Sequence, residues 1–475
     1  MDKIFKNFFF VAVANLLTFG ISALTTFFVP RYLGVENYGY FQLYVFYITY
    51  AYAGVLHFGW VDGILLRYGG DYYENLNKRR FSGQFWLYTA VEIALGCLIC
   101  AGGLAMPFEP KRKMTIVLTG ICILFLMPRE ILQFTLQSTN RLKECAVITT
   151  IEKITYLIAL VYFPLTHSDN FIPMIGMDLL GKIIALVYTV YHCWDVVKEK
   201  PSKLYITLRE ARANIYVGIK LTFASLASLL IIGTVRLAIE NNWNIETFSQ
   251  VSLTLSVSNL LMVFIRAIAT VLFPVLRRQG TEKRKLQELY TTMRGGLMCV
   301  LLGALVLYYP MREVLVSWLP EYEVGLHYMA LLFPLCLFES KMNMLIETFM
   351  KTMRQEKKLL LVNVSAVLLS LLTTYITVYR IGNLDIAVGS IVLLLAFRCI
   401  FAEMLMAQEL NICVILDIVL EIGMALIFIA TAWWIGGITG AVIYLGAYLV
   451  YLCIKRNDLL LIANKCNRLL RPKSR

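Results

Sequence analysis

The feature that most constrains this chain is a series of apolar runs that repeats from one end to the other. A run of about 20 apolar residues crosses the hydrocarbon of a bilayer when it is helical. Fourteen such runs occur, near residues 8–29, 39–60, 82–105, 114–137, 145–165, 171–192, 216–240, 248–275, 295–311, 325–350, 359–379, 386–407, 414–433 and 437–454. We therefore predict an all-α polytopic membrane protein with about 14 transmembrane helices.

The composition agrees with this prediction. Of 475 residues, 59% are hydrophobic and 16% are charged, and the mean hydropathy is +0.69. The formal net charge of +13 does not indicate nucleic acid as a partner, because the Lys and Arg lie in short segments between the apolar runs and form no basic domain. The 11 cysteines are scattered through apolar runs, so we expect neither disulfides nor a metal site, and no cofactor.

The basic segments predict the orientation in the membrane. Lys and Arg concentrate on one side, at 77–80, 198–203, 277–285, 351–358 and in the carboxyl-terminal tail, and the positive-inside rule makes that side cytoplasmic. Both termini are then cytoplasmic. The basic segment "KRK" at 111–113 is the one clear exception to the rule, because this orientation places it on the opposite side. The amphipathic segments 201–216 and 455–472 are expected to contact membrane lipids.

A short motif recurs in the second half of the chain. Arg31-Tyr-Leu-Gly-Val-Glu36-Asn37 is echoed by Arg236-Leu-Ala-Ile-Glu240-Asn241, and "TFGISAL" at 18–24 by "TFASLASL" at 222–229. Transporters built from repeats hold their substrate between the two halves. We predict two pseudo-symmetric six-helix bundles around a central cavity, with bundles at 1–193 and 216–408, a cytoplasmic linker at 194–215, and two further helices with a basic tail at 409–475.

Two motifs support a family resemblance. With "PRYLGVENYG" at 30–39 and "VLFPVLRR" at 271–278, the chain resembles the Wzx-type polysaccharide-transport flippases of the multidrug/oligosaccharidyl-lipid/polysaccharide (MOP) exporter superfamily, over nearly its whole length. The resemblance implies a flippase that moves an undecaprenyl-diphosphate-linked oligosaccharide across the bacterial cytoplasmic membrane by alternating access. It also implies a role in surface-polysaccharide synthesis, alongside glycosyltransferases and a polymerase.

Polar stripes on the helices indicate a route for such a cargo. Ser252, Ser256 and Asn259 follow steps of four and three, which places them on one helix face. Tyr44 and Tyr47 offer rings and hydroxyls to sugars, although tyrosine is also common at membrane interfaces. For the serine stripe, close packing of helices by small residues is an equal alternative.

Cations within the apolar runs are expected to receive the diphosphate, because an arginine in the membrane faces a cavity or a partner. In order of preference the candidates are Arg266, Arg31, Arg236 and Lys220. For Arg31 and Arg236, ion pairs with the nearby Glu36 and Glu240 are the alternative.

Asp62 and Arg67, after the second run, are candidates for gating through a salt bridge between the halves, with a solvated interfacial turn as the alternative. Other intramembrane charges are interpreted as structural pairs, namely Asp178 with Lys182 and Arg129 with Glu130. A coupling cation or proton is compatible with the charges but not identified by them.

Two other functions remain open. A multidrug antiporter of the same superfamily would favour unpaired carboxylates, whereas the charges assigned to the first, seventh and eighth runs are cationic except for Glu240. A membrane polysaccharide polymerase or ligase would need a sizeable outward loop for its chemistry. No loop exceeds about 25 residues, which is too short for a folded catalytic domain, so we predict a transporter and not an enzyme.

Overall fold

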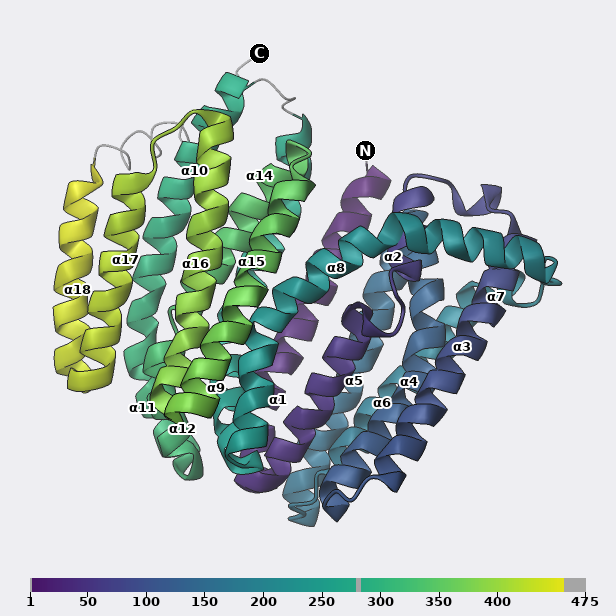
Figure 1. Cartoon of the computed structure of the whole chain (residues 1–475), viewed down its shortest axis with the longest axis horizontal. Helices are drawn as coiled ribbons and strands as arrows, with labels where there is room; N and C mark the ends of the chain where they lie inside the picture. The colour runs from purple at the N-terminus through teal and green to yellow at the C-terminus, as the bar shows by residue number, and fades with distance from the viewer. Residues whose placement is uncertain (1, 279–282, 457–475) are drawn as a thin grey trace. The chain divides into compact units, whose positions relative to one another are not determined.

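A computed structural model describes residues 2–278 and 283–456 (Figure 1). All regular elements in these two ranges are helices, and each of the fourteen predicted runs coincides with helical structure. Eleven of the described helices are long and apolar enough to cross a membrane, or twelve if one bent pair is a single span. The predicted all-α membrane architecture is therefore confirmed.

The chain divides into two compact units, Met1–Leu230 and Ile231–Arg475. The boundary lies inside helix α8 (Leu204–Asn242), so this helix contributes its longer amino-terminal part to the first unit and its last turns to the second. A single uninterrupted helix thus connects the two units.

In the first unit, α4 lies among α1, α2, α3, α5 and α6, and α8 begins across the ends of α2 and α3 (Figure 1). The elements are α1 (Asp2–Tyr50), η1 (Ala51–Val55), α2 (Trp60–Arg67), η2 (Tyr73–Asn75), α3 (Lys78–Ala105), α4 (Pro110–Ser138), α5 (Leu142–Thr166), α6 (Ile172–His192), α7 (Trp194–Val197) and the first part of α8.

The second unit is also a helical bundle, in which α16 packs against α12, α13 and α15. Its elements are α9 (Ile245–Arg278), α10 (Lys283–Ala304), η3 (Leu305–Leu307), α11 (Tyr308–Trp318), η4 (Pro320–Tyr322), α12 (Glu323–Leu332), α13 (Leu335–Ser340), η5 (Lys341–Ile346), α14 (Glu347–Thr352), α15 (Glu356–Thr374), η6 (Tyr375–Ile381), α16 (Leu384–Leu410), α17 (Ile415–Ala430), η7 (Thr431–Ile435) and α18 (Gly437–Ile454). The predicted helix near 325–350 is bent by 48° between Leu332 and Leu335.

The repeated motif marks a break in the helix in both units. The first two predicted helices form one element, α1, which is kinked at Gly34, where φ is 66° and ψ is 175°. Glycine adopts this positive φ without steric cost, and Pro30 inside the helix removes one backbone donor just before it. In the second unit α8 ends at Asn242 and α9 begins at Ile245.

Three glycines let the backbones of α2 and α8 touch. A Cβ atom on Gly63 would overlap the backbone of Asn214, and one on Gly218 would overlap the carbonyl of Gly59. Gly59 also has a φ of 86°, so a side chain there would be strained in any surroundings. Small residues of this kind let helices approach closely inside membranes. Close packing matters there because apolar side chains contact lipid as favourably as they contact another helix.

The contact between α2 and α8 makes Gly63→Ala a sensitive test of the fold. The added methyl group meets backbone, which cannot rotate away, so we expect a loss of about 1–3 kcal/mol of stability and a lower Tm in detergent. Gly102→Ala is the matched control, because no atom lies within 4 Å of its added Cβ. Equal melting temperatures for the two variants would contradict the close contact.

Candidate functional site

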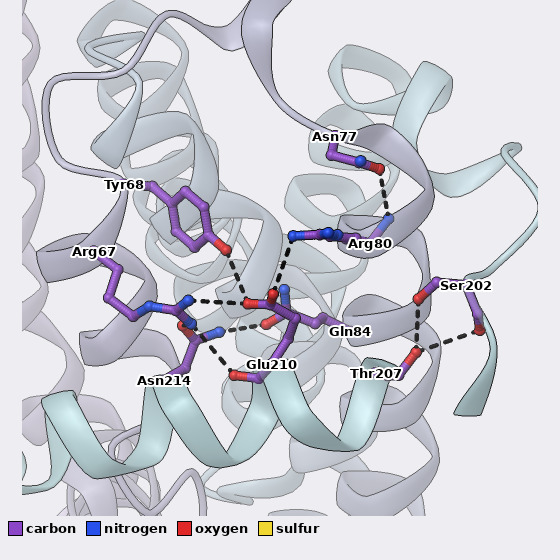
Figure 2. A network of polar contacts seen from close by, with 9 residues as sticks. All are labelled: Arg67, Tyr68, Asn77, Arg80, Gln84, Ser202, Thr207, Glu210 and Asn214. Atoms are coloured by element: carbon purple, nitrogen blue, oxygen red, sulfur yellow. Dashed lines mark hydrogen bonds and ion pairs between the residues drawn. The ribbon is translucent and has the colours of Figure 1, made fainter. Parts of the chain in front are cut away.

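A polar network fastens the amino-terminal part of α8 to α2 and α3 (Figure 2). At its centre, the Glu210 carboxylate accepts hydrogen bonds from Arg67 Nη2 at 3.0 Å, from the Tyr68 hydroxyl at 3.3 Å and from Arg80 Nη1 at 3.3 Å. The Glu210 side chain is only 15% exposed, so these donors replace most of its hydration. One carboxylate of α8 therefore holds the end of α2, the residue after it and the first turn of α3.

Two buried amides extend the network inward. Asn214 accepts a hydrogen bond from Arg67 Nη1 and donates one to Gln84 Oε1, which also accepts from Trp60 Nε1 at 3.2 Å. Asn214 and Gln84 are fully buried. Because buried amides are stable only when hydrogen-bonded, this chain of contacts fixes the position of α8 on α3.

Burial raises the pKa of Tyr68, an effect that the Arg67 guanidinium opposes and the Glu210 carboxylate strengthens. The phenol therefore remains protonated at neutral pH and keeps donating to Glu210. The network thus has a fixed proton donor on the chain segment that leaves α2.

The structure places both predicted gating residues against α8. Arg67 contacts Glu210 and Asn214, and Asp62 accepts a hydrogen bond from Thr222 Oγ1. Their role in gating stays a prediction. The sequence reasoning missed Glu210 and Asn214, although their spacing of four residues on a basic amphipathic helix was a usable signal.

Tyr44, predicted to contact sugar, lies in a buried group in the first unit. It is 1% exposed, and its hydroxyl donates to Asp178 Oδ2 at 2.6 Å. Asp178 also accepts a hydrogen bond from Tyr156 and forms the predicted ion pair with Lys182. Tyr47 is half-buried.

The predicted pair of Arg129 with Glu130 is wrong. Arg129 forms its ion pair with Glu152 of α5, while Glu130 accepts a hydrogen bond from Tyr88 at 3.4 Å. Neighbouring residues on a helix point about 100° apart, so adjacent charges have different environments.

In the second unit the structure brings together two predicted substrate contacts. Arg236 Nη2 donates to Ser252 Oγ at 2.8 Å, and the guanidinium lies 5.1 Å from the centre of the Phe248 ring. Ser252 is buried, Ser256 is half-buried with its hydroxyl donating to the carbonyl of Ser252, and Asn259 is exposed. This face of α9 therefore carries polar groups from the interior to the surface of the unit.

The other predicted cations are dispersed. Arg31 and Lys220 are exposed, and Glu36, the alternative partner of Arg31, forms an ion pair with Lys111 at 2.8 Å. The backbone of Arg266 belongs to α9, but its side chain lies outside the described residues.

A buried charge network in the second unit centres on Glu403, which the sequence analysis had not paired with its partners. Glu403 accepts from Arg294 Nε at 2.6 Å and from Tyr290 at 3.0 Å, and it also contacts Lys341. Lys341 and Arg294 both bind Glu421 as well. The network joins α10, η5, α16 and α17, so the first appended helix is tied to the bundle by ion pairs.

Arg398 organises a second network in the same unit. It donates to Asn363 at 2.9 Å, to Glu339 at 3.0 Å and to Glu347 at 3.1 Å, and it is 1% exposed. Arg398 and Glu403 thus belong to different networks.

Over residues 2–278 and 283–456, no group of three or more His, Cys, Asp or Glu side chains is arranged to hold a metal ion.

The network around Glu210 predicts a local effect on α8. In Glu210→Gln, Arg67 and Arg80 lose their carboxylate, so amide hydrogen exchange in residues 204–214 should rise by about fivefold, as expected for roughly 1 kcal/mol of lost local stability. Glu199→Gln, which removes the more exposed ion pair with Arg79, is the control and should change exchange in this segment less than twofold, roughly. Unchanged exchange in Glu210→Gln would show that the network does not fix α8.

No family model and no curated protein matches the chain by sequence. Solved structures do match. Lipid II flippase MurJ in an inward closed conformation has a TM-score of 0.70 at 12% identity, covering 95% of this chain and 99% of its own. A MOP superfamily transporter from Pyrococcus furiosus, described as having a binding pocket of reverse polarity, has a TM-score of 0.58 at 12% identity and covers 86% and 96%.

An outward-facing multidrug resistance MATE family transporter of the MOP superfamily has a TM-score of 0.57 at 12% identity, with 86% of this chain and 96% of that chain covered. The similarity in each case spans both units of the chain. At these identities the comparison establishes the fold and supports the resemblance to the superfamily. The chain thus has the fold of the MOP-superfamily transporters and of the lipid II flippase MurJ.

Proposed function

We propose that this protein is a flippase that translocates an undecaprenyl-diphosphate-linked oligosaccharide across a bacterial cytoplasmic membrane by alternating access. The observation that carries the proposal is the fold shared with a lipid II flippase over 95% of this chain and 99% of that one. The Wzx-like motifs at 30–39 and 271–278 direct the proposal to surface polysaccharide precursors. Glycosyltransferases and a polymerase are the expected partners in that pathway.

The polar face of α9 supports a hydroxyl-rich cargo. Sugar hydroxyls are costly to strip of water, so a route across hydrocarbon needs polar groups along it. Ser252, Ser256 and Asn259 supply such groups, and Arg236 adds a guanidinium at the deeper end of the face. We assign this face to the cargo route.

The cations support an anionic head group. A diphosphate is recognised best by arginine, whose planar donors bind two oxygens at once. Arg266 is the first candidate because the sequence offers it no acidic residue within one turn of its helix, and Arg31, Arg236 and Lys220 follow.

Export of cationic drugs is the second candidate, favoured by the MATE-type structures that share the fold. Such a transporter needs carboxylates that are available to the drug. In the described part of the second unit, Glu403, Glu421, Glu339 and Glu347 are all occupied by arginine or lysine. Because these four carboxylates are already paired with cations, they favour the flippase over a transporter of cationic drugs.

Loss of the predicted diphosphate contact should impair transport without unfolding the protein. We expect Arg266→Ala to reduce surface-polysaccharide export at least about tenfold while its amount in the membrane stays near normal, and Arg266→Lys to restore part of the export by keeping the charge. Export and membrane abundance are measured in the same cells. Full export by Arg266→Ala would remove this residue from the proposed site.

The assigned face of α9 also predicts a labelling pattern. In a background without the native cysteines, single cysteines at Ser256 and Asn259 should react with small charged thiol reagents, whereas one at Val257, which is 1% exposed, should react poorly. Added lipid-linked oligosaccharide should slow labelling at the first two positions. If cysteines at Ser256 and Asn259 react no faster than one at Val257, α9 does not line the route.

A further inference from the structure

The amino-terminal part of α8 presents an exposed face that has no role in the cargo route. Tyr205, Arg209, Arg212 and Tyr216 follow steps of four, three and four residues, so their side chains share one face of the helix. All four residues are exposed, and each tyrosine is 76% exposed. We call these four residues the outer face of α8.

The opposite side of the helix is fixed on the protein. Asn214 is buried and is hydrogen-bonded to Arg67 and to Gln84 (Figure 2). Asn214 lies two residues from both Arg212 and Tyr216, and residues two apart in a helix point about 160° away from each other. The network that holds α8 therefore turns the outer face away from the protein.

The two arginines of the outer face have no partner within the described part of the chain. Arg209 and Arg212 form no hydrogen bond, ion pair or ring contact there. Arg67 and Arg80, in contrast, both bind Glu210. Glu210 is the only acidic residue between positions 204 and 220, and these contacts direct it toward α2 and α3. The outer face is thus cationic, and its charge is complementary to an anion from outside the chain.

An open groove follows the same face of α8. It has a volume of about 550 Å³ and is lined by Arg209, Arg212, Ala213, Ile215, Tyr216 and Ile219. Sites for small ligands have volumes of about 300–1,000 Å³, so a head group fits in this space. The lining joins two guanidinium groups to aliphatic and aromatic carbon. This combination suits a molecule that is anionic at one end and apolar at the other.

The position of α8 in the fold identifies that molecule. The helix begins across the ends of α2 and α3, at the end of the unit that the positive-inside rule predicts to be cytoplasmic (Figure 1). Beside the outer face, Leu204, Leu208 and Val217 are 64%, 51% and 39% exposed. Exposed aliphatic side chains beside arginine and tyrosine are typical of a helix in the membrane interface, where cations lie at the level of the lipid phosphates.

We propose that the outer face of α8 binds the phosphate of an anionic phospholipid from the surrounding membrane. Arg209 and Arg212 donate hydrogen bonds to the phosphate oxygens, and the rings of Tyr205 and Tyr216 lie among the head groups. The lipid holds one side of α8 while the polar network holds the other, so lipid binding stabilises the start of the helix. The ligand is a bulk membrane lipid, so the proposal goes beyond the flippase function and does not depend on the cargo.

Hydrogen exchange of the full-length protein in lipid nanodiscs tests the proposal. When phosphatidylglycerol replaces part of the phosphatidylcholine, protection of residues 204–216 should rise at least about threefold, because an anionic surface attracts each nearby arginine about fivefold. Combined Arg209→Gln and Arg212→Gln should reduce the rise to less than about 1.5-fold. Lysine at both positions should keep part of the rise, since the charge remains. In about 1 M NaCl the native rise should also be lost, because exposed charges then interact over roughly 3 Å only.

A matched control removes the same charge from a neighbouring segment. Combined Lys198→Gln and Lys200→Gln removes two exposed cations that precede α8, and this variant should respond to phosphatidylglycerol as the native protein does. A second readout is the amount of phosphatidylglycerol that the purified protein retains in native mass spectrometry. The arginine-to-glutamine variant should retain less of this lipid than the control variant.

Three results would overturn the proposal. The first is a native protein whose protection at 204–216 does not respond to phosphatidylglycerol. The second is an equal loss of the response in the arginine and the lysine variants, which would indicate a general effect of surface charge. The third is a response to undecaprenyl diphosphate but not to phosphatidylglycerol, which would assign the outer face to the cargo. No arm measures transport, so failure here is distinguishable from failure of the flippase assignment.

Discussion

The structure depends on one constraint, which is that polar groups removed from water must find partners inside the protein. In hydrocarbon there is no solvent to compensate an unpaired donor or carboxylate, and each such group costs several kcal/mol, roughly. The chain meets this constraint with side-chain networks that bridge helices far apart in sequence. Glu210 gathers donors from the segments around α2 and α3, and Glu403 does the same for α10 and η5.

These networks identify buried charges that hold the helices together. Breaking a buried ion pair costs about 3–5 kcal/mol because one charge is left without its partner, even though the intact pair adds little net stability. The charges around Glu403 and Arg398 satisfy one another and tie helices together. Glu92 and Glu130 differ, because each has a buried oxygen without a hydrogen-bond partner and neither forms an ion pair with an arginine or lysine in the described structure.

The helices and the repeated break in them could be predicted from the sequence, because both depend on local properties of the chain. Apolar length determines a span, and Pro30 with Gly34 determines where α1 kinks, although two predicted helices then form one kinked element. The Asp178–Lys182 pair was predictable for the same reason, since residues four apart share a helix face. The partners of Arg67 and Arg294 were not, because they lie more than 100 residues away and depend on how the helices pack.

The central claim, that the cargo is a lipid-linked oligosaccharide, is tested most directly in proteoliposomes. The purified protein is reconstituted with undecaprenyl-diphosphate oligosaccharide in vesicles, and the fraction accessible to an added sugar-oxidising reagent is followed with time. The account predicts that this fraction rises from the outer-leaflet share toward completion only in vesicles that contain the protein. An accessible fraction that stays at the outer-leaflet share, together with protein-dependent efflux of a cationic dye, would contradict the flippase and indicate a drug exporter.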